Sequence, residues 1–343
     1  MSRPDPSGPK KLASSRAYTL TLSPQIIYSK SKLLEQLVSS QVYRHLEFQA
    51  VGNWWICRNA SEAAQTPQAE MLRRMPNGRE DIFSDRTIDV RAKRGLMKFL
   101  KFAVDFENQP EIWKDSAENP LTTFLAAKFQ LPESMQKFIS ALTLSLNDPA
   151  HTTVGYSLPR IMRHLTSIGV FGLGFGSVVP KWGGGAEIAQ VACRAGAVGG
   201  SVYVLGTGVK AVRSDAVELI LTNDEIVKTA YYVSGQERAP STELPDAADA
   251  ISRVITVVSS NMAGLFKTTV EGAPIGAVAV IAFPAGSLSV DEEGSTHPVY
   301  IIAHSSETGE CPRDQCKHTP FLHFQKHYMM NELENLSTLS DIP

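Results

Sequence analysis

The 343-residue sequence has no apolar run long enough to cross a bilayer. Its longest apolar stretches, such as residues 275–284, fall well short of the ~20 residues that a membrane-spanning helix needs. The opening segment, MSRPDPSGPKK, has early charges and prolines where a signal peptide would have an apolar core. We therefore expect a cytosolic protein whose role at membranes, where it has one, is peripheral or carried by a partner.

The sequence also lacks an excess of charge of either sign. Lysine and arginine total 33 against 35 aspartates and glutamates, so the formal net charge is -2. Since general nucleic-acid binders normally show a strong basic excess, nucleic acid is not an expected partner. Four cysteines are too few for a disulfide framework and are typical of a protein from a reducing compartment.

A complete dinucleotide-binding fingerprint is missing as well. The run Gly172-x-Gly174-x-Gly176 lacks a third glycine at the required spacing. The chain then reaches Pro180 without the strand and helix that should flank such a motif. We therefore expect no nucleotide cofactor.

One segment near the C-terminus contains residue types that bind zinc. It holds Cys311, Cys316, His318, His323 and His327, which are enough ligands for a tetrahedral site. However, the Cys-x4-Cys spacing is loose and no partner Cys-x2-Cys pair exists. We interpret the segment as a surface loop with incidental histidines and expect no metal.

The first part of the chain reads as strands with one helix. Residues 1–14 are polar and predicted to be disordered, and the alternation over residues 17–22 predicts a strand. Ser31 is the expected N-cap of a helix that ends near Val38. Residues 46–58 predict a β-hairpin with its turn at Gly52-Asn53.

From Asp89 onward the apolar period changes from two to 3.6 residues, which predicts a block of helices. The inward positions are expected to be Met97, Leu100, Ala103 and Val104, then Leu121, Phe124 and Leu125, then Met135, Phe138, Ile139, Leu142 and Leu146, then Leu158, Ile161, Met162 and Leu165. Strand-like alternation returns in residues 209–221, 227–233, 253–258, 277–283 and 299–303.

These patterns predict an α/β (α+β) fold. Residues 15–88 and 169–305 are expected to form one discontinuous, sheet-containing domain. An all-helical domain, residues 89–168, interrupts it, and residues 306–343 follow as a C-terminal extension.

Residues 184–205, GGAEIAQVACRAGAVGGSVYVL, are the most informative segment. A glycine cluster leads into an amphipathic helix, Gly199-Gly200 ends it, and a strand is expected directly afterwards, so the unit should pack tightly. Glu187, Gln190 and Arg194 share one side of the helix, at spacings of three, four and seven. They form a solvated helix face, an internal hydrogen-bond set or a docking surface.

This segment resembles the G-E-I-x-Q-x-x-C-R-x-x-A-V-x-G-G-x-Y-x-L stretch of Rab escort proteins, a branch of the GDP dissociation inhibitor superfamily. Residues 28–48, 75–102 and 109–146 resemble further blocks of that family in the same order. The second of these contains PNGREDIF and LMKFLKF, which are similar to stretches typical of escort proteins. The resemblance covers roughly residues 15–285.

The resemblance implies a fold related to flavin monooxygenases and a non-catalytic accessory function. Such a protein would bind GDP-loaded Rab GTPases and present them to the Rab geranylgeranyltransferase αβ heterodimer. It would then shield the attached geranylgeranyl lipid and deliver the product to membranes. Family members begin with a glycine-rich βαβ unit that has no counterpart ahead of Tyr18, so half of the usual docking platform is expected to be missing.

The resemblance also implies roles for particular residues. Glu187, Gln190, Arg194 and Tyr203 match platform positions that hold the switch regions of the GTPase. Arg44 matches a second block, where it either contacts the partner or binds backbone carbonyls or a neighbouring acid. The helical domain would either open a lipid cleft or enclose an ordinary core, with candidate residues Met97, Leu100, Val104, Phe138, Ile139 and Leu142.

Two other functions are compatible with the resemblance. A GDP dissociation inhibitor would recycle prenylated Rabs without engaging the transferase. A flavin-dependent oxidoreductase would share the ancestral fold, but the lack of a phosphate-cradling glycine motif argues against it. No residue is proposed as a nucleophile, acid or base.

Overall fold

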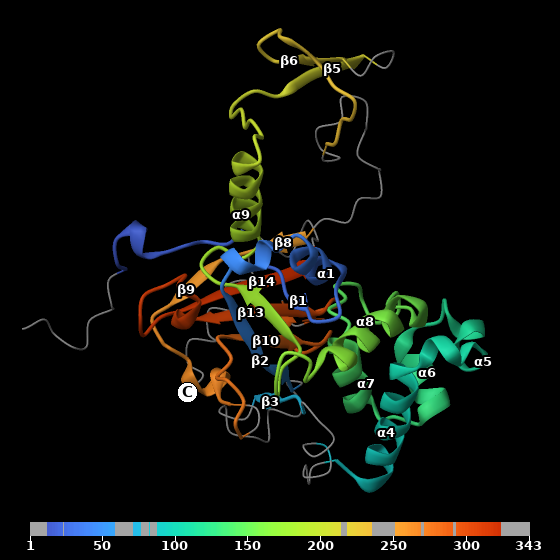
Figure 1. Ribbon diagram of the computed structural model, residues 1–343. Helices are drawn as coiled ribbons and strands as arrows, with labels where there is room; N and C mark the ends of the chain where they lie inside the picture. Colours follow the sequence, from blue (N-terminus) through green and yellow to red (C-terminus); the bar gives the residue numbers. More distant parts are fainter. Residues whose placement is uncertain are drawn as a thin grey trace, which may run out of the picture. The chain divides into compact units, whose positions relative to one another are not determined.

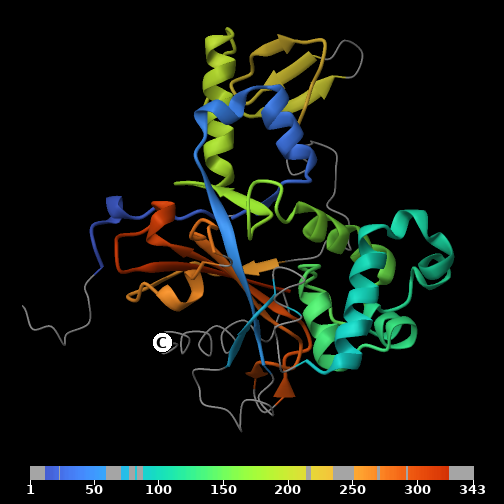
Figure 2. The same ribbon diagram turned by 60° about the horizontal axis from the view of Figure 1, so that its bottom comes forward.

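The structure is a computed structural model that describes residues 12–22, 24–58, 71–76, 82, 88–213, 218–234, 251–268, 271–290 and 293–323. The chain forms two compact units, Met1–Val191 with Ile251–Pro343, and Ala192–Ala250. The first unit holds a large sheet with a group of helices beside it (Figures 1 and 2). Among the described residues, no helix is both long enough and apolar enough to span a membrane.

The described part of the first unit is built on a nine-stranded mixed sheet (Figure 1). Its strands are β1 (Ile27–Tyr28), β2 (Phe48–Cys57), β3 (Leu72–Arg74), β4 (Ser177–Pro180), β8 (Ile251–Arg253), β9 (Thr256–Val258), β10 (Val278–Phe283), β13 (Val299–Ser305) and β14 (Cys316–His323). They lie in the order β1-β4-β2-β10-β13-β14-β8, with β3 beside β2 and β9 beside β14. Strand β10 runs parallel to β2 and antiparallel to β13. A separate hairpin joins β11 (Ser289–Val290) and β12 (Glu293–Gly294).

Strand β10 is buried on both faces, which explains why its sequence, VAVIAF, is continuously apolar. Val278 and Val280 belong to the core on the side of the helices. Ala279 and Ile281 belong to a second core, which also contains Phe266. The centre of the sheet therefore separates two apolar cores.

Strand β2 is one continuous strand, so the hairpin predicted with its turn at Gly52-Asn53 is wrong. A Cβ on Gly52 would lie 2.9 Å from the Cα of Gly276. Glycine inside a strand often marks such a close approach of two backbones. The buried amide of Asn53 donates to the carbonyls of Leu265, at 3.0 Å, and Lys267, at 2.6 Å, which compensates for its burial.

The described helices of the first unit include two that begin where the sequence predicts, after Ser31 and Asp89. They are α1 (Lys32–Ser39), α4 (Val90–Val104), α5 (Pro110–Trp113), α6 (Leu121–Phe129), α7 (Glu133–Ala141) and α8 (Val154–Ser167). The Ser31 hydroxyl accepts the Leu34 amide, and the Asp89 carboxylate accepts the amides of Arg91 and Ala92, so both predicted helix starts carry an N-cap. The chain between residues 88 and 168 forms helices and turns, and no strand.

The inward face of α4 differs from the prediction. The residues that α4 buries are Ala92, Leu96, Phe99, Phe102 and Ala103. Of the residues predicted to face inward, Met97 and Leu100 are only partly buried and Val104 is 47% exposed. The face is rotated because the large ring of Phe99 packs edge-on against Phe129, with ring centroids 5.3 Å apart.

Two segments have a different secondary structure from the predicted one. The strand expected over residues 17–22 is absent, since the chain forms a 3-10 helix at Ser15–Ala17 and then continues without a strand. Conversely, the predicted extension over residues 306–343 contains β14, which pairs with β13 inside the sheet. His318 is therefore buried and not part of a surface loop. His327 lies outside the described residues.

The second unit contains a three-stranded antiparallel sheet of β5 (Val209–Arg213), β6 (Glu218–Leu221) and β7 (Ile226–Lys228). These strands confirm the alternation seen in the sequence. The strand predicted directly after Gly199-Gly200 is absent, because residues 201–204 form no strand. Val202 is 85% exposed and Leu205 is 93% exposed.

Three histidines are buried in the described part of the first unit, and two of them, His164 and His318, lie in no ion pair. The ring of His164 packs edge-on against Trp54, with centroids 4.7 Å apart, and its Nδ1 lies 3.4 Å from the Tyr28 hydroxyl. Burial lowers the pKa of His164 to about 4. Burial, and then the charge of His304, lowers the pKa of His318 to about 4 as well. Both imidazoles are therefore neutral at pH 7.

We expect Gly52→Ala to reduce the free energy of unfolding by about 1 to 3 kcal/mol, because the added methyl group must push apart two buried backbones. Urea unfolding followed by circular dichroism measures this change. Gly208→Ala is the matched control, since its Cβ would make an ordinary 3.5 Å contact with a Thr222 methyl group. Equal stabilities of the two variants would show that the strands can separate at no cost.

We expect the free energy of unfolding to fall as the pH drops from about 6.5 to about 4, because His164 and His318 take up protons only when the chain unfolds. Each histidine should remove about 2 kcal/mol by pH 5. Urea unfolding at pH 7, 6 and 5 gives the slope, which His164→Gln should reduce. His45→Gln, at an exposed position, should leave the slope unchanged. A wild-type slope in His164→Gln would mean that other groups set the pH dependence.

Candidate functional site

Helix α9 (Gly185–Val198) begins after a loop with an unusual backbone. Trp182 has φ 74° and Gly184 has φ 59°, both in the left-handed region. Glycine adopts this region readily, whereas tryptophan rarely does. The Glu187 amide donates to the Gly184 carbonyl at 3.1 Å and closes the first turn of the helix. A bulky residue held at positive φ is often found at a functional segment.

No residue of α9 is buried, so the tight packing predicted for residues 184–205 is wrong for the helix. The predicted end of the helix is confirmed. The Gly199 amide donates to the Ala195 carbonyl at 3.0 Å, and Gly200 has φ 91°. In the part of α9 that belongs to the first unit, Gln190 is exposed.

The polar stripe on α9 has no internal bonds. Glu187 is half-buried, whereas Gln190 and Arg194 are exposed. None of the three side chains forms a hydrogen bond or ion pair with any part of the chain that the structure describes. The alternative of an internal hydrogen-bond set is therefore wrong, whereas the solvated face and the docking surface both stay predictions.

Tyr203 does not lie with this stripe. A Cβ on Gly196 would lie 2.3 Å from the Tyr203 hydroxyl, so the tyrosine folds back against α9 at that glycine. At 3.6 residues per turn, Gly196 points about 200° away from Arg194. The structure therefore brings together only three of the four platform candidates.

Arg44 lies in a 3-10 helix, Val42–His45, and is exposed. Its guanidinium has no partner among the described residues, so the predicted bond to a carbonyl or acid is absent. The neighbouring acid, Glu47, instead pairs with Lys181, with Nζ 2.7 Å from Oε1. The Lys181 amide also donates to the Glu47 carbonyl at 2.8 Å. Through these bonds the 44–47 turn lies beside the loop that leads into α9.

Trp182, which is not among the predicted site residues, also lies in the loop before α9. Its ring is 49% exposed, and the Lys181 ammonium lies 4.8 Å from the ring centroid. The indole and this cation therefore stand next to the first turn of α9. A large aromatic residue just before a glycine cluster was the available signal, because aromatic side chains are enriched in binding surfaces.

The residues predicted to line a lipid cleft belong to the helical core. Ile139 and Leu142 are buried, and Met97, Leu100 and Phe138 pack against the same core from its edge. The sixth candidate, Val104, is the exposed residue at the C-terminal end of α4. In this conformation the core is filled by its own side chains.

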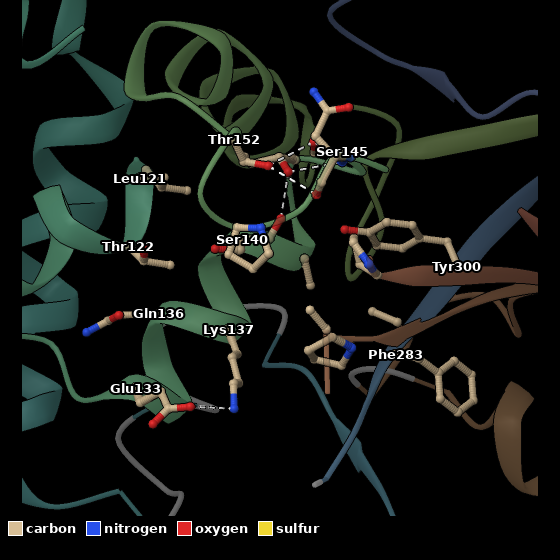
Figure 3. Close-up of a pocket in the computed structure, with 18 residues that line it drawn as sticks. Leu121, Thr122, Glu133, Gln136, Lys137, Ser140, Ser145, Thr152, Phe283 and Tyr300 are labelled. Atoms are coloured by element: carbon tan, nitrogen blue, oxygen red, sulfur yellow. Dashed lines mark hydrogen bonds and ion pairs between the residues drawn. The ribbon is translucent and has the colours of Figure 1, made fainter. Parts of the chain in front are cut away.

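A cavity of about 390 Å³ lies between the helices and the sheet. Figure 3 shows Ser140 and Lys137 on its helical side and Phe283 and Tyr300 on its strand side. None of the six cleft candidates lines it. The helical wall is mainly polar, with Thr122, Gln136, Ser140, Thr143, Ser145, Asn147 and Thr152.

The cavity is also lined by Glu133, Lys137 and Tyr300. The Lys137 ammonium lies 2.6 Å from Glu133 Oε1. The hydrogen bond and then the charge of Lys137 lower the pKa of the Glu133 carboxyl. Burial is the main cause that raises the pKa of Tyr300 well above its usual range. The cavity therefore combines hydroxyl and amide groups and one ion pair on its helical side with apolar residues on its strand side.

The sequence model of the family described as "GDI: GDP dissociation inhibitor" matches residues 2–270. The chain belongs to the GDP dissociation inhibitor family. This confirms the superfamily inferred from residues 184–205. The fold of this family member is similar to "Crystal Structure of RAB GDI from Plasmodium Falciparum", with a TM-score of 0.70 and 16% identity over 96% of this chain and 73% of that one. At that identity the similarity shows the fold alone, and it confirms the predicted fold class.

Two curated relatives are fungal. "Rab proteins geranylgeranyltransferase component A" of Saccharomyces cerevisiae is 32% identical over 306 residues, which is 87% of this chain and 47% of that protein. The protein of the same name from Candida albicans is 30% identical over 323 residues, or 88% of this chain and 46% of that protein. This family member therefore spans about half the length of these relatives.

We expect Cys193, on α9, to be the first of the described cysteines to react with a thiol reagent in the native protein. It is half-exposed, whereas Cys57, Cys311 and Cys316 are buried. Burial raises the pKa of Cys57 and Cys311 to about 11 and that of Cys316 to about 12. Because the thiolate is the nucleophile, these three should react slowly. Labelling with Ellman's reagent should show one fast thiol that Cys193→Ser removes. A fast phase that persists in this variant would contradict the assigned burial.

Proposed function

We propose that this chain acts as a Rab escort protein, the non-catalytic accessory component of Rab geranylgeranyltransferase. It binds GDP-loaded Rab GTPases, presents them to the transferase heterodimer and escorts the prenylated product to membranes. The observation that carries this proposal is the similarity, over nearly nine tenths of this chain, to proteins named component A of that enzyme.

The docking surface in this proposal is the exposed side of α9 together with the loop at its start. Gln190 and Arg194 are exposed and unpaired within the described part of the chain, so binding a partner breaks no internal bond. Arginine offers several donors in a fixed fork and often dominates binding energy at interfaces. Arg44 and Trp182 are exposed in the first unit and are further candidate contacts there. Tyr203 would join only if it left Gly196.

The proposed lipid site is the edge of the helical core. Met97, Leu100 and Phe138 are partly buried there and would meet a geranylgeranyl chain first. Deeper entry would displace the packing of Ile139 and Leu142, which are buried. Burial of the lipid contributes about 0.8 kcal/mol per methylene, enough to offset such repacking.

A reconstituted lipidation reaction tests the function. The chain is added to purified transferase heterodimer, geranylgeranyl diphosphate and an unmodified, GDP-loaded Rab, and lipid transfer is measured. Transfer that depends on the chain supports the escort function. Binding of prenylated Rab without any stimulation of transfer would indicate a recycling GDP dissociation inhibitor instead. No binding of either Rab form would overturn the proposal.

We expect Arg194→Glu to weaken binding of GDP-loaded Rab at least tenfold, or about 1.4 kcal/mol, because it places a carboxylate at an exposed arginine of the docking surface. Titration calorimetry measures the affinity. Lys114→Glu is the matched control, since it makes the same charge change at an exposed position outside α9. Equal affinities of Arg194→Glu and wild type would remove α9 from the interface.

A further inference from the structure

A buried polar cluster centred on Glu310 lies close to the start of α9. The side chain of Glu310 is almost completely buried. Its Oε1 accepts hydrogen bonds from the Thr21 hydroxyl and the Lys317 ammonium. Its Oε2 lies against Nδ1 of His304. Three polar groups from three separate segments of the chain thus converge on one carboxylate.

The electrostatics of the cluster keep this carboxylate ionised. Burial alone would raise the pKa of Glu310, but the hydrogen bond and charge of His304 and the charge of Lys317 lower it to about 2. Burial lowers the pKa of Lys317, and Glu310 opposes that effect. A buried charge of this kind is tolerated only while its partners stay in place. The positions of the Glu310 oxygens are therefore fixed by their donors.

Thr21 connects this carboxylate to α9. Its hydroxyl donates to Glu310, and the Thr19 amide donates to the Glu310 carbonyl at 3.0 Å. Its methyl group fills the space beside Gly184, since a Cβ there would lie 2.9 Å from Thr21 Cγ2. Gly184 is the residue whose positive φ turns the chain into the helix. Thr21 therefore contacts Glu310 through its hydroxyl group and Gly184, at the start of α9, through its methyl group.

A second contact holds the same loop from the neighbouring residue. The Trp182 amide donates to the Thr308 carbonyl at 3.0 Å. The Trp182 ring lies over Gly309, where a Cβ would come within 2.4 Å of it. Gly309 has φ 77° and directly precedes Glu310. The 308–310 turn thus contacts the loop before α9 at Trp182 and, through Thr21, at Gly184.

We propose that Thr21 and Glu310 are positioning residues for the docking helix. Glu310, held by Lys317 and His304, fixes Thr21, and Thr21 fixes the turn at Gly184 from which α9 starts. Neither residue touches the partner. The effect on partner affinity rests on the function proposed above, whereas the effect on the helix itself does not.

Paired variants at Thr21 test the hydroxyl separately from the methyl group. Thr21→Val keeps the shape and removes the donor, and Thr21→Ser keeps the donor and removes the methyl group. In the free protein, we expect Thr21→Val to speed hydrogen exchange of the amides at residues 187–191 at least fivefold relative to those of β10. Thr21→Ser keeps the bond to Glu310 but loses the methyl contact with Gly184, so it should also speed this exchange, by less than Thr21→Val. The same order is expected for binding of GDP-loaded Rab, with about fivefold weaker affinity for Thr21→Val.

The outcomes separate the inference from the proposed function. Unchanged exchange at residues 187–191 in Thr21→Val, or equal acceleration in both variants, would overturn the role of the hydroxyl. Faster exchange in Thr21→Val with no Rab binding by wild type would support the positioning role and refute the function. If Thr21→Val does not fold, Trp182→Ala offers a second test at a half-exposed residue. It should also speed exchange at residues 187–191. Unchanged exchange would show that the contacts of the 182–184 loop do not hold the start of α9.

Discussion

The close parallel pairing of β2 with β10 is the constraint on which the rest of the first unit depends. Gly52 and Gly276 let the two backbones approach within a distance that no side chain permits. Strand β10 is then buried from both sides, with the helices packed on one core and the 3-10 turn around Leu265 and Phe266 on the other. Apolar burial on both faces is the main favourable contribution to such a sheet.

Helix α9, in contrast to β10, is not held by apolar burial. It has no buried residue, so its own packing adds little to its orientation. The start of α9 is set by the positive φ angles of Trp182 and Gly184 and by the polar cluster at Glu310. Polar clusters of this kind give less net stability than apolar packing, but they can specify one arrangement. The start of α9 is thus held by polar contacts within the first unit.

Much of the fold could be predicted from the sequence because its signals are local. The N-caps at Ser31 and Asp89 and the apolar run of β10 depend on neighbouring residues only. Gly52-Asn53 misled the interpretation because a close contact with Gly276 and a hairpin turn both favour glycine. The buried strand β14 was missed because it contains the polar residues Lys317 and His318, which are buried once β13, β8 and β9 pair with the strand. Helical spacing alone predicts that Glu187, Gln190 and Arg194 share one side of α9. The position of Tyr203 depends on its contact with Gly196, which no sequence periodicity indicates.

The pairing of β2 with β10 also determines when the protein can fold. Residues 51–56 pair with residues 278–282, so the central ladder joins segments that are more than two hundred positions apart along the chain. Closing such a long loop costs entropy before any contact repays it, and folding that depends on distant contacts is slow. The helices from α4 to α8 are local in sequence and can form earlier. During synthesis, the apolar face of these helices that packs on the sheet stays exposed until β10 has left the ribosome.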